Sequence, residues 1–113
     1  MYYEKLAQYE RDGFQVIVDK TYEDIPPSDQ FEADEVDEIC RKIDDGTYDY
    51  FMLRVRVMFD GHEMGSHYLG GCLYEDAEEV LTDGTAEDCI SEALREAKDH
   101  IKSLREKLSK VAV

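Results

Sequence analysis

The residues with the most reactive side chains lie close together between positions 62 and 72. His62, His67 and Cys72 are of the types that bind zinc, which takes three or four such ligands. Residues five apart on a strand point to opposite faces, so His62 and His67 are not expected to share an ion. Ser66 stands beside His67, but neighbours on a strand also face apart, and no strand–turn–helix pattern would present the serine as a nucleophile. We therefore predict no metal site, no cofactor and no enzymatic activity.

Carboxylates are the other abundant reactive groups, with 28 Asp and Glu against 13 Lys and Arg and a formal net charge of −15. The segment 44–49 has the residue types of a calcium loop but lacks the ligand order of the twelve-residue motif. So many carboxylate pairs are conceivable that no acid–base pair stands out. The distribution of the charge is more informative than any single pair.

The negative charge is confined to the first three quarters of the chain. From residue 85 onward there are six acids and six bases, with most acids first and most bases last, as the helix dipole favours. Residues 1–84 hold 22 acids and seven bases. Between residues 23 and 49 eleven acids meet two bases, and between residues 60 and 88 nine acids meet none.

Two interpretations of this acidity remain open. High net charge keeps a small protein soluble. Alternatively, a negative surface steers the protein to a basic partner, even though acids at helical spacing, such as Asp34 and Glu38, repel each other. The most basic surfaces in a cell bind nucleic acid, where carboxylates can compete with phosphates; the same charge disfavours direct binding to DNA or RNA. The carboxylates that we predict to bind a partner are Asp34, Glu35, Asp37, Glu38, Asp44, Asp45, Asp49, Glu75, Asp76, Glu78, Glu79 and Asp83.

The first predicted element covers residues 2–12, where Tyr2, Leu6 and Tyr9 recur at helical spacing and a glycine follows. A strand hairpin is the competing interpretation, because the Asp-Gly pair at the end also favours a tight turn. We expect the helix. Residues 14–22 follow as a strand rich in β-branched side chains.

Two prolines end this strand, and a helix is expected from Ser28 or Asp29 to Asp45. The helix should turn five apolar residues toward the core, namely Phe31, Val36, Ile39, Cys40 and Ile43.

The strongest strand signal covers Tyr50–Phe59, in which alternate residues are apolar. The pair Asp60-Gly61 predicts a hairpin turn, and the return strand should run from His62 to about Leu73. Glycines in the return strand indicate a bulge or a close backbone approach. The core face of Tyr50–Phe59 should carry Phe51, Leu53, Val55, Val57 and Phe59.

The opposite face of the same strand carries Arg54 and Arg56 among Tyr50, Met52 and Met58. One interpretation is a half-exposed sheet face on which both arginines pair with acids. The other is a surface that contacts a partner, since Tyr, Met and Arg are enriched at interfaces.

A short helix over residues 75–82 and a long helix from Thr85 complete the chain. The apolar residues of the long helix alternate in steps of four and three, which indicates a heptad seam that packs on the sheet or, alternatively, mediates a homodimer. The seam consists of Ile90, Leu94, Ala97, Ile101, Leu104, Leu108 and Val111. The predicted fold is α+β, with a three-stranded, mostly antiparallel sheet, helices packed on one face and a long C-terminal helix, in one compact domain over residues 1–113.

A cytoplasmic location is expected, since the first residues lack a signal-peptide pattern and the three cysteines suggest no disulfide framework. No segment is apolar over the roughly 20 residues of a membrane span, so no membrane partner is expected.

In size, acidity and the acid-rich segments Phe31–Asp49 and Tyr74–Asp83, with tyrosines interleaved, the chain resembles the small acidic proteins that bacteriophages and plasmids use against host defence. These include anti-restriction and anti-CRISPR proteins that mimic DNA. The resemblance implies a non-enzymatic inhibitor that occupies the basic nucleic-acid-binding surface of a partner, in the host cytoplasm if phage-encoded. The neutral C-terminal helix departs from the most extreme mimics and suggests that one side of the molecule binds, with Tyr48, Tyr50 and Tyr74 as contacts at the rim. The alternative is a housekeeping protein-interaction module that dimerises through the last helix.

Overall fold

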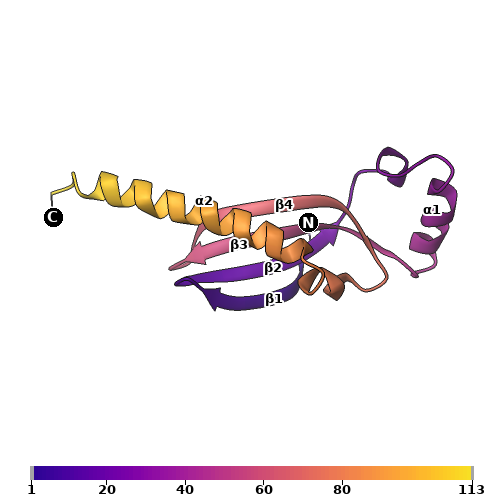
Figure 1. Cartoon of the computed structure of the whole chain (residues 1–113), viewed down its shortest axis with the longest axis horizontal. Coiled ribbons are helices and arrows are strands. Elements are labelled where there is room, and N and C mark those ends of the chain that lie inside the picture. Colours follow the sequence, from indigo (N-terminus) through magenta and orange to yellow (C-terminus); the bar gives the residue numbers. More distant parts are fainter. Residues whose placement is uncertain (1, 113) are drawn as a thin grey trace.

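The computed structural model describes residues 2–112 and has an antiparallel sheet with one long helix along one face (Figure 1). The sheet order is β1-β2-β3-β4, so each strand pairs with its neighbour in the chain. The mixed α+β class is confirmed, and the sheet has four strands where three were predicted. The elements in order are β1 (Glu4–Arg11), β2 (Phe14–Tyr22), the short 3-10 helix η1 (Pro27–Asp29), α1 (Val36–Asp44), β3 (Asp49–Phe59), β4 (His62–Tyr74), the 3-10 helix η2 (Ala77–Leu81) and α2 (Thr85–Leu108).

The additional strand is β1, so the helix predicted for residues 2–12 is wrong and the competing hairpin is right. Asp12 and Gly13 both have positive φ, 55° and 86°, as a two-residue hairpin turn requires. The pairing of β1 with β2 shifts register between Lys5 and Ala7, which places Leu6 in a bulge. That extra residue breaks the alternation of the strand and produces the spacing that resembles a helix.

The core lies between α2 and one face of the sheet. Strict alternation in β3 points its apolar residues to this face, as predicted, although Phe59 at the strand end is 49% exposed. Small residues on α2 let the helix approach the sheet closely. The fully buried strand residues are Val16, Val18, Phe51, Leu53, Val55 and Val57, and the buried residues of α2 are Ala86, Cys89, Ile90, Ala93, Leu94 and Ala97.

The second half of α2 extends past the sheet (Figure 1). The molecule measures 62 × 25 × 24 Å, and its radius of gyration of 17.5 Å exceeds the roughly 13 Å typical of a compact chain of this length. The predicted seam therefore packs on the sheet only in its first part, and Leu108 and Val111 are 63% and 55% exposed. None of the helices within residues 2–112 has the length and apolarity needed to cross a membrane.

The histidines of β4 lie on one face, and the prediction that they point to opposite faces is wrong. His62 pairs with Phe59 and His67 pairs with Val55, and these two β3 residues point to the same face. A bulge in β4 between the two pairs adds one residue, so both histidines also point to that face. Four residues along a strand span about 13 Å, so the two rings remain far apart. In the described part of the chain no group of three or more His, Cys, Asp or Glu side chains is arranged to hold a metal ion.

The two minor helices differ from their predictions. The helix expected from residue 28 begins at Val36, and none of its residues is buried, so the prediction that its apolar side faces the core is wrong. The two prolines and η1 displace this segment to the end of the sheet, where α1 stands apart from α2 (Figure 1). The helix expected over residues 75–82 is the 3-10 helix η2, which buries Ala77 and Val80.

Candidate protein-interaction surface

Most of the predicted partner-binding carboxylates lie in a segment that leaves the sheet between β2 and β3. We call residues 24–49 the acidic lobe. Its base is fixed by Glu23, which is 6% exposed and accepts hydrogen bonds from the backbone N–H groups of Gly71, at 2.7 Å, and Ile25, at 3.1 Å. The Tyr50 hydroxyl donates to the Ile25 carbonyl oxygen at 2.8 Å. The backbone of the lobe is thus anchored to β3 and β4, although α1 itself is exposed.

The glycines of β4 make this anchor possible. A Cβ on Gly70 would lie 2.8 Å from the Glu23 carboxylate oxygen, too close for contact. Gly71 has a φ of +70°, which disfavours other residues. The predicted bulge and close approach are confirmed here, and their role is to admit the carboxylate of Glu23.

The acidic lobe presents its carboxylates to solvent with little internal neutralisation. Each of its predicted binding residues is exposed except Asp49, which is half-buried. Within residues 2–112 ion pairs neutralise only two of them: Glu38 pairs with Lys42 at 3.4 Å, and Asp49 pairs with Lys20. Hydrogen bonds from the Thr47 side chain and backbone lower the pKa of Asp45.

A second group of acids lies on the connection between β4 and α2, residues 75–84, which we call the acidic connector. All five of its predicted binding residues are exposed. Asp76 caps η2 by accepting the Glu78 N–H at 3.0 Å. Asp83 accepts the Tyr74 hydroxyl at 2.6 Å and the Thr85 N–H at 2.9 Å, and these bonds lower its pKa. One carboxylate in each group, Asp45 in the lobe and Asp83 in the connector, is thus held in its ionised form by hydrogen bonds to its neighbours.

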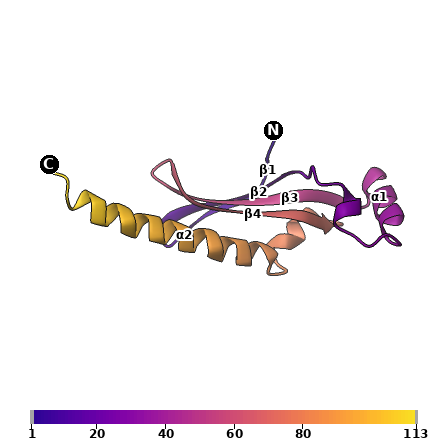
Figure 2. The same ribbon diagram turned by 90° about the horizontal axis from the view of Figure 1, so that it is seen from above.

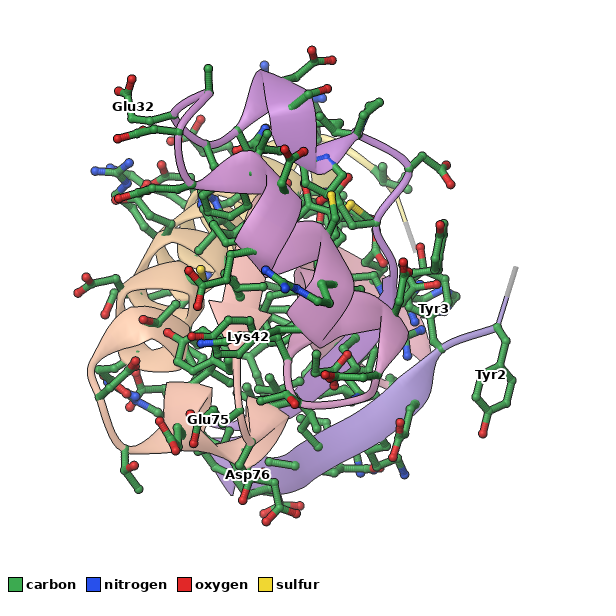
Figure 3. The ribbon with its side chains drawn as sticks, turned by 90° about the vertical axis from the view of Figure 1, so that its right-hand side faces the viewer. Tyr2, Tyr3, Glu32, Lys42, Glu75 and Asp76 are labelled. Atoms are coloured by element: carbon green, nitrogen blue, oxygen red, sulfur yellow. The ribbon has the colours of Figure 1, made fainter. Side chains whose placement is uncertain are left out.

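The two acidic segments lie toward the same end of the molecule, opposite the protruding end of α2 (Figure 1). In the view onto this end, α1 stands in front, and Glu32, Glu75 and Asp76 project outward around it (Figure 3). Elsewhere some acids are matched by bases across elements, as in Arg11 with Glu87, at 2.8 Å. Lys98 pairs with Asp12 at 2.7 Å in the same way. The exposed carboxylates of the acidic lobe and the acidic connector thus lie toward one end, and we call these two segments together the acidic end.

The tyrosines predicted at the rim have structural roles. Tyr50 is buried and holds Ile25, while Tyr74 binds Asp83. Tyr48 is half-buried beneath the Lys42 ammonium, 5.2 Å from the ring centroid.

The exposed aromatic residues near the acidic lobe are instead Tyr2 and Tyr22, at 80% and 77% exposure. They border a hollow of about 440 Å³ whose lining also includes Glu4, Lys20 and Asp49. The placement of Tyr22 just before the prolines was the sequence signal that could have identified it, since this is where the chain leaves the sheet. The lobe also exposes three acids outside the predicted set, Asp24, Asp29 and Glu32.

The other candidate chemistry of the sequence finds no supporting geometry in the described residues. Cys72 is buried, and desolvation raises the pKa of its thiol to about 11, so it is protonated at neutral pH. Ser66 and His67 lie on opposite faces of β4, since their partners Arg56 and Val55 do so on β3. These groups therefore do not form an activated nucleophile.

Comparisons of this chain with models of known protein families, with curated proteins and with solved structures found no match.

Proposed function

We propose that this protein is a non-enzymatic inhibitor whose acidic end binds the basic nucleic-acid-binding surface of another protein, in the manner of a DNA mimic. The observation that supports the proposal most is the exposure of eleven of the twelve predicted carboxylates, of which only Glu38 has an ion-pair partner within residues 2–112. Exposed carboxylates without partners are available to the Lys and Arg side chains of another molecule.

The physical advantage of this arrangement is that the backbone beneath the charges is already ordered. Anchoring by Glu23 and Tyr50 reduces the conformational entropy that the acidic lobe loses on binding. A partner that holds nucleic acid has a cationic groove whose Lys and Arg side chains neutralise phosphates. Its association with the acidic end should be fast at low salt and weaken as salt screens the charges.

The charge of the molecule also suggests an orientation. Residues 98–112, at the protruding end of α2, carry five bases and two acids, opposite in sign to the acidic end. A basic groove would attract the acidic end and repel the α2 end. The bound protein would therefore present α2 outward.

The experiment that tests this proposal is capture of partners from cell lysate at about 50 mM and about 500 mM NaCl, a range over which the Debye length falls about threefold. The binding variant replaces four acids of the lobe with amides: Asp34→Asn, Glu35→Gln, Asp37→Asn and Glu38→Gln. The matched control changes the net charge equally on α2: Glu92→Gln, Glu96→Gln, Asp99→Asn and Glu106→Gln.

We expect the wild type and the α2 control to retain a nucleic-acid-binding protein at low salt, and the lobe variant to lose it. Capture that is independent of salt, or that both variants lose equally, would contradict the proposal. The equal charge change is essential to the comparison, because it separates the location of the acids from their number.

The second candidate is an interaction module that dimerises through α2, which the exposure of Leu108 and Val111 favours. The charges beside the seam oppose it. Arg105 lies at the heptad position on one side of the exposed part of the seam, and Lys107 lies on the other. Two copies paired along the exposed part of this seam would bring the Arg105 and Lys107 side chains of both copies close together, so we favour the inhibitor.

A further inference from the structure

The face of the sheet opposite α2 is not covered by another element. Figure 2 shows α2 along one side of the sheet and no helix over the middle of the other. We call this second side the open face. Its centre is formed by Asp19 on β2 and by Arg54 and Arg56 on β3, which pairing places on the same side.

Asp19 and Arg54 form a complete ion pair. Asp19 is 3% exposed, and Arg54 donates to its two oxygens from Nε at 2.8 Å and from Nη2 at 2.7 Å. The Arg54 guanidinium stacks on the Tyr3 ring, 3.4 Å from the ring centroid. Arg54 therefore neutralises the buried carboxylate of Asp19, and the Tyr3 ring covers the Arg54 guanidinium.

Arg56 is a second cation for the same carboxylate. It reaches an Asp19 oxygen that Arg54 already holds, and only from Nη2 at 3.3 Å. Its Nε is buried and has no hydrogen-bond partner within residues 2–112. Two guanidinium groups thus share one carboxylate, and Arg56 is incompletely paired: Glu10 and Glu63 lie on the same face, but neither forms an ion pair with it within residues 2–112.

We infer that the open face docks an acidic segment of a partner polypeptide, one carboxylate of which binds Arg56. Arg56 is 28% exposed in its side chain, so a carboxylate can reach its outer nitrogens. If the guanidinium rotates so that its Nε edge faces outward, the Nε–H group can also donate to the partner's carboxylate. The two groups then form the bidentate pair that arginine and carboxylate favour. This site is separate from the acidic end and does not depend on the function proposed for it.

The surroundings of Arg56 fit a polypeptide rather than a nucleic acid. Ile17 and Met58 flank it as half-buried apolar side chains, and Tyr68 on β4 is 50% exposed. Tyr, Met and Arg are the types enriched in protein interfaces. A nucleic acid would instead need several unpaired cations in a row to contact successive phosphates, whereas a single carboxylate needs only Arg56.

The test uses NMR on the uniformly ¹⁵N-labelled full chain, because the Nε–H group of an arginine gives its own signal. The probe is a blocked five-residue peptide of alternating glutamate and leucine, and its control is the same peptide with glutamine in place of glutamate. We expect the acidic peptide to shift the Nε–H signal of Arg56 in a saturable way, together with the amide signals of Tyr68 and Met58. The Nε–H signal of Arg95, which is exposed on α2 and paired with Glu92, is the internal reference and should stay in place.

Two matched variants complete the test. Arg56→Gln should weaken binding of the acidic peptide roughly tenfold, because it removes a charge-assisted hydrogen bond. Arg95→Gln should leave binding unchanged. Equal shifts with both peptides, shifts spread over Arg56 and Arg95 alike, or unchanged affinity of Arg56→Gln would overturn the proposal. A single-stranded oligonucleotide that shifts the same signals more strongly than the peptide would also overturn it, by assigning the face to nucleic acid.

Discussion

Gly65 on β4 lies so close to α2 that a Cβ placed on it would overlap the Ala93 carbonyl oxygen and come within 2.9 Å of the Ala97 amide nitrogen. Ala93 and Ala97 are themselves completely buried. Backbone therefore meets backbone at this crossing, and the absence of a side chain on β4 sets the distance between helix and sheet. The crossing lies near the point where α2 leaves the sheet, so it also directs the protruding half of the helix.

Gly65→Ala should accordingly destabilise the fold. The clash involves helix backbone, which cannot move aside like a flexible side chain, so the free energy of unfolding should fall by about 1–3 kcal/mol. Urea unfolding followed by circular dichroism measures this change. Ser66→Ala, one residue away on the open face, is the control and should stay within about 0.5 kcal/mol of the wild type. A Gly65→Ala protein as stable as this control would show that the helix is free to shift.

Glu23→Ala should loosen the acidic lobe. The change leaves the N–H groups of Gly71 and Ile25 without their acceptor, and an unsatisfied buried donor costs about 1–3 kcal/mol. Hydrogen exchange should accelerate at both amides while the backbone amides in the middle of β3 remain protected. The control is Asp24→Ala, an exposed neighbour. Equal protection of the Gly71 amide in both variants would contradict the role of Glu23 as an anchor.

Cys72 should make the protein less stable in alkali. Burial raises the pKa of the folded thiol from 9.0 to about 11, so between these values the unfolded chain loses the Cys72 proton and the folded chain retains it. The stability that the buried, protonated Cys72 thiol contributes is therefore fully present below about pH 9, and it is lost as the pH rises toward 11. Urea unfolding from pH 7 to pH 11 should show a steeper decline for the wild type than for Cys72→Ala. Parallel declines would mean that Cys72 ionises equally in both states.

The protein should sediment as a monomer. Cations beside the exposed part of the α2 seam, including Arg105 and Lys107, oppose pairing of two copies through Leu108. Analytical ultracentrifugation at micromolar concentration should give one species of 13.1 kDa with the high frictional ratio of a 62 Å long particle. A species of about twice that mass which grows with concentration would support the dimerising module instead.

Sequence patterns predicted the fold best where alternation is strict. β3 alternates without interruption and is followed by Asp60-Gly61, so its faces and its turn were predictable. Bulges caused two of the errors. The one at Leu6 makes β1 look helical, and the one before Gly65 brings His62 to the face of His67.

Eleven of the twelve carboxylates chosen from the sequence are exposed, and their binding of a partner stays a prediction. Carboxylates without nearby cations in the sequence are exposed, because an unpaired charge is costly to bury. Glu23 is the exception, and its burial depends on Gly71, 48 positions away, which no local pattern shows. The incomplete pairing of Arg56 is likewise visible only once β2 and β3 place Asp19 between two arginines.

The most direct test of the central claim is competition for nucleic acid. The nucleic-acid-binding protein recovered by capture is loaded with a fluorescent oligonucleotide, and release of the oligonucleotide is followed by polarisation as this protein is added. We expect the wild type and the α2 control to displace the oligonucleotide. The lobe variant should require roughly tenfold more protein, since each of the four lost surface ion pairs contributes about 0.2–1 kcal/mol. Binding of the wild type without displacement of the oligonucleotide would contradict the proposal that its acidic end occupies the nucleic-acid-binding surface.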